Sequence, residues 1–286
     1  MLSKFDLITA KSLEEAVAAA ADGYTVVAGG SDIFVMMHKG VEYDKIVDIS
    51  GLDELRQIRV TDDGLEIGAL ATHNEIAENL AVRQDYPALA EGCISVGSTQ
   101  VRNRGTIGGN ICNASPAADS AGPLLLYDAI VRIEGKDGKK EVPITEFFTG
   151  VKKTVLQPGD IVTSVFLPQT FAHECSAYKK LMKRGAMEIG IMSAGVRIMM
   201  DASGNCVDAR VSLSAVAPTP IRAPKAEDAL KGGPVTEASI AAAAEEAYEL
   251  ATPHTWRNSE EWSKDMTREY VKMAAEAALS RMKGGF

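Results

Sequence analysis

The sequence predicts a globular protein whose two domains both combine helices and strands. Of its 286 residues, 46% are hydrophobic and 24% are charged, which is the balance of a chain that buries an ordinary core. Helical and strand-like spacings of apolar residues follow one another along the chain. After Pro168 the short segments between glycine turns give way to longer strands and two helices, so we expect a domain boundary near residues 168–175.

The first elements are a helix, a strand and a glycine turn. Ser12 and Glu15 have the spacing of a capping box, and the apolar residues that follow recur at helical intervals until Gly23. The sequence TVVAGG at 25–30 then predicts a short apolar strand that ends at two glycines.

Two further strands are expected at 45–50 and 65–70, and a helix at 74–90 with Pro87 in its last part. The stretch 95–123 differs from its neighbours because it is rich in Gly, Ser, Asn and Pro and has few large apolar residues. It predicts a long ordered loop, and such loops in compact domains are usually functional.

The second half predicts antiparallel strands followed by helices. Strands are expected within 176–184 and 191–223, with a turn at the sequence DASGN. Helices are expected at 237–251 and about 263–281. One face of the last helix carries a Met and aromatic stripe, which predicts contact with the core; its members are Met266, Tyr270, Met273 and Ala277.

Composition argues against several classes of partner. The formal charge of -9 and the pI of about 5.1 disfavour nucleic acid, since nucleic-acid binders usually present a basic face. No apolar run approaches the ~18 residues of a membrane span, and the N-terminus has no secretory apolar core, so we expect a cytoplasmic protein. The four cysteines are far apart, which predicts free thiols and no metal or iron–sulfur site built by this chain alone.

Two glycine-containing turns are candidates for chemistry. They are VVAGGSDI, from Val26 to Ile33, and TIGGN, from Thr106 to Asn110. Glycine can adopt positive φ and leaves its backbone N–H uncovered, and successive N–H groups form concavities that suit a diphosphate. Neither turn has the GxGxxG or P-loop pattern. The pair therefore predicts that the chain binds a phosphorylated cofactor at a site that is neither a GxGxxG site nor a P-loop.

Two charged features have alternative explanations. Asp119 either caps a helix that starts near Pro123 or accepts hydrogen bonds from cofactor hydroxyls. The basic run at 179–184 is either a solvated face or a counter-charge to phosphate. No Ser-His-Asp, Cys-His or paired-carboxylate arrangement can be nominated from local spacing. A protein whose bound cofactor carries the chemistry needs no such arrangement.

Four segments together resemble the FAD-binding subunits of bacterial molybdenum hydroxylases of the xanthine dehydrogenase type. They are AGGSD at 28–32, QVRNRGTIGGNICNASPAADSAGPLLLYDA at 100–129, SAVAPTPIRAPKAEDAL at 214–230 and TWRNSEEWSKDM at 255–266. The resemblance implies an α+β fold. A two-subdomain FAD-binding fold of the vanillyl-alcohol oxidase type would span 1–170, divided into about 1–55 and 56–170, and a smaller C-terminal α+β domain of the CO dehydrogenase flavoprotein type would span 175–282.

The resemblance also implies a role in electron transfer. Electrons would pass from a large molybdopterin subunit, through two [2Fe–2S] clusters on a small subunit, to FAD on this chain and then to NAD or another acceptor. The assembly would be a heterotrimer or its dimer. We expect the FAD to be non-covalent, because no histidine-bearing attachment motif lies near the glycine turns.

Carried over residue by residue, the resemblance assigns sixteen FAD contacts. The diphosphate would lie near Val27, Ala28, Gly29, Gly30, Ser31 and Asp32, with Val26 and Ile33 flanking. The second FAD loop would comprise Thr106, Ile107, Gly108, Gly109 and Asn110. Asp119 matches a further cofactor contact, and Val162 and Lys179 match contacts nearer the flavin ring. Gly185 departs from the family, whose members often carry an acidic residue beside the flavin.

Three other functions stay open. The chain could serve another molybdenum hydroxylase, acting on CO, an aldehyde or nicotinate. It could be a self-contained flavin oxidoreductase, which turnover by the isolated chain would reveal. It could also be a non-enzymatic nucleotide-binding or scaffold protein, which a flavin spectrum would separate from the rest.

Overall fold

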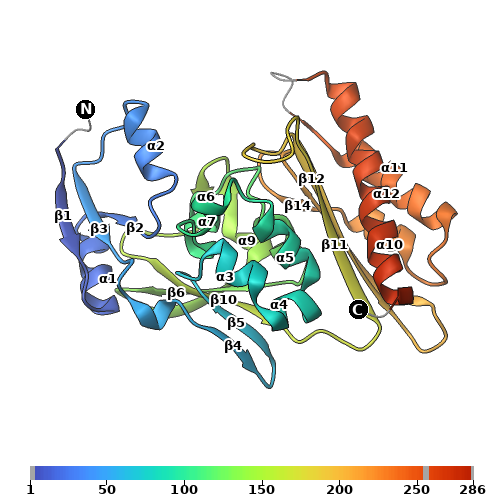
Figure 1. Cartoon of the computed structure of the whole chain (residues 1–286), viewed down its shortest axis with the longest axis horizontal. Coiled ribbons are helices and arrows are strands. Elements are labelled where there is room, and N and C mark those ends of the chain that lie inside the picture. The colour runs from blue at the N-terminus through green and yellow to red at the C-terminus, as the bar shows by residue number, and fades with distance from the viewer. Residues whose placement is uncertain (1–3, 254–257, 285–286) are drawn as a thin grey trace.

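A computed structural model describes residues 4–253 and 258–284. The chain forms three consecutive blocks, which Figure 1 shows side by side: an N-terminal block (4–55), a middle block (56–168) and a C-terminal block (174–284). Helices and mostly antiparallel sheets are combined throughout, so the predicted α+β class is confirmed. Residues 255–257 of the fourth resembling segment lie outside the described residues.

The N-terminal block is a small parallel sheet with two helices. Its strands β1 (Asp6–Thr9), β3 (Lys45–Asp48) and β2 (Thr25–Val27) lie in that order. Helix α1 (Leu13–Ala21) begins as predicted, because Ser12 accepts a hydrogen bond from the Glu15 N–H, and it ends before Gly23, whose φ is 87°. Helix α2 (Ile33–His38) and the short 3-10 helix η1 (Asp53–Leu55) complete the block.

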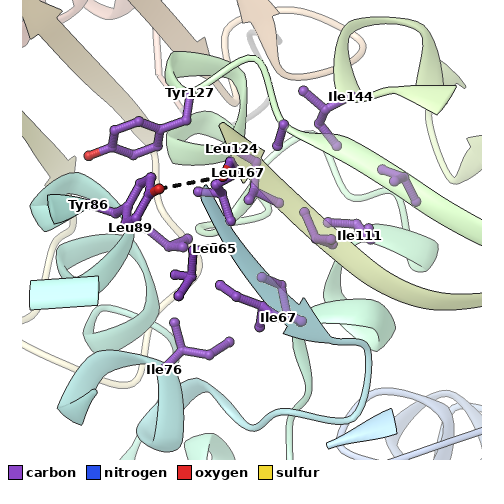
Figure 2. Close-up of a cluster of buried hydrophobic side chains, with 14 of the residues drawn as sticks. Leu65, Ile67, Ile76, Tyr86, Leu89, Ile111, Leu124, Tyr127, Ile144 and Leu167 are labelled. Carbon is purple, nitrogen blue, oxygen red and sulfur yellow. Dashed lines mark hydrogen bonds between the residues drawn. The ribbon is translucent and has the colours of Figure 1, made fainter. Parts of the chain in front are cut away.

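The middle block is a five-stranded antiparallel sheet with helices on one face. The strand order is β4 (Ile58–Thr61), β5 (Gly64–Gly68), β10 (Ile161–Pro168), β6 (Ile130–Gly135) and β7 (Gly138–Pro143). Figure 2 shows Leu65 and Ile67 of β5 in the core between sheet and helices, with Leu89 and Leu124. Glu66, between them in sequence, points to the opposite face, as strand alternation requires. Helix α9 (Ile144–Phe147) and the hairpin β8 (Phe148–Gly150)–β9 (Lys153–Thr154) follow β7.

The prediction of a single helix at 74–90 is wrong. The segment forms three helices, α3 (His73–Glu78), α4 (Leu80–Asp85) and α5 (Pro87–Ile94). Asn79 is extended (ψ 128°) and caps α4 with its side chain, which accepts from the Val82 N–H. Pro87 starts a helix rather than ending one, because the first helical position needs no backbone N–H.

The expected loop at 95–123 is also largely helical. It contains α6 (Thr99–Arg102), α7 (Ile107–Cys112) and the start of α8 (Ala121–Leu126). Ser98 and Thr106 are N-caps, whose hydroxyl oxygens accept hydrogen bonds from backbone N–H groups. Small polar residues favour caps and loops alike, so composition alone does not distinguish one long loop from several short helices.

The C-terminal block is a four-stranded antiparallel sheet covered on one face by helices. Strands β11 (Glu174–Leu181), β12 (Met192–Met200), β13 (Cys206–Ser214) and β14 (Ile221–Arg222) lie in sequence order. The covering helices are α10 (Pro224–Leu230), α11 (Glu237–Leu250) and α12 (Glu260–Gly284). The predicted DASGN turn is confirmed by hydrogen bonds from the N–H groups of Ser203 and Asn205 to Asp201.

The core face of α12 is shifted from the predicted stripe. Its fully buried members are mainly alanines, because the helix packs closely on β11 and β12. Met273, expected in the core, is 46% exposed, whereas Met266, Tyr270 and Ala277 pack only at the margin. The buried apolar residues are Val271, Ala274, Ala275 and Ala278.

The uncovered face of the C-terminal sheet lies against α5 and α8 of the middle block. We call this contact the seam. Cations of the C-terminal block meet anions of the middle block across it: Lys180 meets Asp119, Arg281 meets Glu91, and Arg210 and Arg222 both meet Asp128. All four cysteines are free. Across the described ranges, no helix is both long and apolar enough to cross a membrane.

Candidate FAD-binding site

The first glycine turn offers uncommitted backbone N–H groups. It links β2 to α2, and Gly30 has φ 71°, which curls the backbone. Within the described residues, none of the five N–H groups from Ala28 to Asp32 donates to a protein acceptor. Ser31 and Asp32 are exposed. Consecutive free N–H groups around a left-handed residue are the arrangement that binds anionic oxygens.

Gly29 fixes this turn against the middle block. A methyl carbon added at Gly29 would lie 1.6 Å from the carbonyl oxygen of Arg104, which is backbone and has little freedom to move. Gly105, which follows Arg104, is also near the turn, because a carbon added at Gly105 would be 3.3 Å from Ser31 Oγ. The first turn therefore meets residues 104 and 105, which directly precede the second motif.

The second motif uses its own N–H groups inside the protein. The N–H of Ile107 donates to Ala71 O, that of Gly108 to Ala69 O, and that of Gly109 to Thr106 Oγ1. Gly108 and Gly109 are helical, so neither uses the positive φ that glycine permits. Instead Gly108 is required by packing, since an added carbon would lie 2.7 Å from Ala69 Cβ. Gly109 is exposed, which leaves room for a ligand to approach its backbone.

Asp119 does not cap α8. Ser120 holds the cap position and makes no side-chain capping bond, whereas Asp119 is 8% exposed and faces the seam. Its Oδ2 lies 2.7 Å from Lys180 Nζ, and its Oδ1 accepts from the Tyr178 hydroxyl at 3.0 Å. Burial raises the pKa of Asp119, and the Lys180 ammonium and both hydrogen bonds oppose that rise. Both carboxylate oxygens thus have protein partners.

Ser120 links Asp119 to the second motif. Its hydroxyl donates to Asn110 Oδ1 at 2.7 Å, which orients the amide of Asn110. Because the oxygen end is occupied, the NH2 end is the part of Asn110 available to a ligand. Ser120 is fully buried, so this orientation is well supported by packing.

Val162 and Lys179 stand apart from these residues. Val162 is 4% exposed, and its side chain packs in the core of the middle block. Its backbone is nevertheless near α7, because Thr163 O accepts from the Ala69 N–H and Ala69 O accepts from Gly108. Lys179 shares the helix-facing side of β11 with Ala177, whereas Lys180 points to the seam.

Two residues near the site were missed by sequence reasoning, Lys180 as an individual residue and His73. Strand alternation offered a signal for Lys180, since it places Tyr178 and Lys180 on one face. His73 had no such signal. Its ring lies 3.3 Å from the position of a carbon added at Gly105, and it is 1% exposed. Among the described residues, no group bonds its buried Nδ1.

Burial lowers the pKa of His73 to about 4, with a smaller contribution from the positive charge of Arg102. The unfolded chain takes up this proton near pH 6.5 and the folded chain near pH 4, so stability falls as the pH drops between those values. From pH 7 to pH 5, we expect His73 to account for about 2 kcal/mol of lost unfolding free energy. Urea unfolding of His73→Phe should lack this loss. Substitution of the exposed residue His38 serves as the control. An unchanged pH dependence of stability in His73→Phe would contradict the assignment of this loss to His73.

A separate cleft of about 380 Å³ lies on the charged face of the middle sheet. Arg59, Glu66, Arg132 and Glu141 form an ion-pair network there. None of the predicted FAD contacts lines this cleft. Its mutually paired charges leave little net attraction for a charged ligand.

The chain matches known proteins along nearly its whole length. Residues 3–170 match the family described as the FAD binding domain in molybdopterin dehydrogenase, and residues 176–278 match the CO dehydrogenase flavoprotein C-terminal domain. The chain is 35% identical over 265 residues to the xanthine dehydrogenase FAD-binding subunit of Escherichia coli O157:H7, covering 90% of each chain. This chain belongs to the FAD-binding subunits of the molybdenum hydroxylase family.

Other members of the molybdenum hydroxylase family are nearly as similar. The nicotinate dehydrogenase FAD-subunit of Eubacterium barkeri is 30% identical over 296 residues, with 99% of each chain covered. A chain of carbon monoxide dehydrogenase from Hydrogenophaga pseudoflava superposes with a TM-score of 0.94 at 30% identity, covering 98% of this chain and 99% of that chain. The predicted two-part flavoprotein fold is therefore confirmed.

The geometry fits the cofactor of this family. FAD carries a diphosphate, and the turn at Ala28–Asp32 offers such an anion five N–H groups that have no acceptor in the described part of the chain. Gly109 permits close approach of a ligand, and Asn110 presents its amide nitrogen beside it. When bound, FAD supplies the redox chemistry, and the protein supplies binding and orientation.

Proposed function

We propose that this chain is the electron-transfer subunit of a xanthine dehydrogenase-type complex, in which it holds FAD and passes electrons to NAD. The observation that carries the proposal is the turn at Ala28–Asp32, whose backbone N–H groups have no acceptor among the described residues. The 35% identity to a xanthine dehydrogenase subunit supports the choice within the family. The 30% identity to a nicotinate dehydrogenase subunit makes that enzyme's chemistry the second candidate.

The predicted FAD contacts take distinct roles in this proposal. The backbone of Val27–Asp32 would bind the diphosphate, with Val26 and Ile33 holding the turn to β2 and α2. From the second motif, Gly109 and Asn110 would contact the cofactor, whereas Thr106, Ile107 and Gly108 would set the helix in place. Asp119 stays a predicted cofactor contact, and Val162 and Lys179 stay predicted contacts nearer the flavin ring. For Lys179 to contact FAD, an edge of the cofactor would have to lie on the helix-facing side of β11.

The partners in this proposal are a molybdopterin subunit and a [2Fe–2S] subunit, in a heterotrimer or its dimer in the cytoplasm. We propose that the [2Fe–2S] subunit docks near residues 111–123 and 180–190. Three apolar side chains are exposed around those segments: Ile94 (49%), Met187 (57%) and Ile189 (62%). The Met187 N–H donates to Gly97 O, which places Met187 beside the segment that follows Ile94, and Lys180 Nζ donates to Asp119 Oδ2, which joins 180–190 to 111–123. Exposed apolar groups of this kind favour an obligate interface.

Purification of the chain tests the proposal directly. We expect a yellow protein with a flavin spectrum, and acid precipitation should release the flavin into the supernatant.

The isolated chain should reduce an artificial dye with NADH but should not oxidise hypoxanthine or xanthine, since purine oxidation belongs to the molybdenum partner. Purine oxidation by the rigorously purified chain would contradict the relay role. Purification from the native host should recover iron and molybdenum with the chain.

The Gly109→Val variant tests the second motif. A branched side chain would cover the exposed backbone at Gly109 and press on Thr106 Oγ1, which an added carbon would already meet at 2.9 Å. We expect the Kd for FAD to rise on the order of 100-fold, which corresponds to about 2.7 kcal/mol. Flavin fluorescence titration of the apo chain measures it. Full flavin content in a folded Gly109→Val protein would remove this motif from the site.

A further inference from the structure

Lys152 links the first glycine turn to the residues that follow α7. It lies at the tip of the β8–β9 hairpin, in a segment that neither glycine motif includes. Its Nζ donates to Asn113 Oδ1 at 2.6 Å and lies 3.8 Å from Asp32 Oδ2. Its backbone N–H donates to Ala114 O at 2.9 Å. Lys152 therefore bridges the end of α7 and the carboxylate of the first glycine turn.

The backbone holds this bridge in place at a cost. Lys152 has φ 58° and Ala114 has φ 45°, and left-handed conformations cost non-glycine residues on the order of 1 kcal/mol each. Stability of the folded chain does not explain that cost. The side chains of Lys152 and Asp32 are 48% and 53% exposed, and exposed ion pairs contribute only about 0–1 kcal/mol. Strained residues of this kind cluster at ligand sites.

The charge of Asp32 suggests what Lys152 does. Asp32 belongs to the turn with the free N–H groups, yet its carboxylate would repel the two negative charges of a diphosphate. An ammonium 3.8 Å from that carboxylate offsets the repulsion. The second contact, to Asn113, holds the ammonium between the turn and α7.

We propose that Lys152 is a positioning residue of the FAD site, which neutralises Asp32 and thereby allows the first glycine turn to accept the FAD diphosphate. This inference rests on the proposed binding of FAD at Ala28–Asp32. It adds the β8–β9 hairpin to the site and makes part of the FAD affinity electrostatic.

Titration of the full-length apo chain with FAD, followed by flavin fluorescence, tests this role. For Lys152→Met we expect a Kd about 10-fold higher at low ionic strength. The difference should be smaller in 0.5 M salt, where the Debye length falls to roughly 4 Å. Lys152→Arg should restore binding, because it keeps the charge. Lys153→Met is the matched control, since Lys153 is the next exposed lysine on the same hairpin, and it should bind FAD like the unmodified chain.

The Asp32→Asn background separates charge compensation from other effects. Without the carboxylate, Lys152→Met should weaken FAD binding much less than in the unmodified background. The melting temperature of the apo chain should change by no more than about 4 °C in Lys152→Met, as expected for an exposed pair.

Three results would overturn the inference: unchanged FAD affinity in Lys152→Met, a loss that Lys152→Arg does not restore, or an equal loss in the Asp32→Asn background. An unmodified chain that binds no FAD would instead overturn the proposed function, so the two failures are distinguishable.

Discussion

Replacing Lys180 with methionine is expected to destabilise the protein by about 3–5 kcal/mol, because it leaves the buried Asp119 carboxylate without its counter-charge. Lys180 is 3% exposed and Asp119 11% exposed as side chains, so water cannot take over the role of the ammonium. Of the donors in residues 4–253 and 258–284, Tyr178 alone would remain bonded to that carboxylate. Urea unfolding at pH 7 measures the loss.

The pH dependence and two further variants identify the cause. Burial already raises the pKa of Asp119, and removal of Lys180 raises it further, so the folded variant would bind a proton that the unfolded chain releases. Its stability should therefore increase as the pH is lowered from 7. Lys180→Met combined with Asp119→Asn should recover part of the loss. Lys179→Met, on the other face of β11, should change stability by about 0.5 kcal/mol or less.

Gly29→Ala should be the most damaging single methyl addition in the first glycine turn. The added carbon would lie 1.6 Å from Arg104 O, so the N-terminal block has to move away from the middle block. We expect a loss of roughly 3 kcal/mol or more in unfolding free energy and severe loss of FAD, because the two motifs meet at this contact.

Gly51→Ala provides the control for Gly29→Ala. An added carbon at Gly51 meets nothing within 4 Å, and its φ is not positive. Its stability should change by no more than about 0.5 kcal/mol. A Gly29→Ala protein that folds normally and retains its flavin would show that the close backbone contact is unnecessary.

The first glycine turn could be predicted because its signals are local. Two glycines after an apolar strand require a sharp turn whatever surrounds them, and Gly30 does adopt positive φ. The second motif looked equivalent from sequence. It differs because Ala69 and Ala71, far away along the chain, accept its N–H groups. Such long-range hydrogen bonds cannot be recognised from the residues of the motif itself.

The role of Asp119 could not be decided for a similar reason. Its partners Tyr178 and Lys180 lie about sixty residues away along the chain, in the sheet of the C-terminal block. Neighbouring lysines at 179 and 180 look alike in sequence, and only the register of β11 directs one to the seam and the other to the helices. The short helices α6 and α7 were missed because helices of this length depend on tertiary packing rather than on periodicity.

The seam between the middle and C-terminal blocks has a fixed polarity, with cations on the C-terminal side and carboxylates on the other. The C-terminal domain is therefore not a freely exchangeable module. A chimera that borrowed this domain from a relative would have to bring Lys180, Arg210, Arg222 and Arg281, or their equivalents, in register with Glu91, Asp119 and Asp128. A donor domain lacking them would leave the buried Asp119 and the more exposed Glu91 and Asp128 without their cations, however well its apolar core folded.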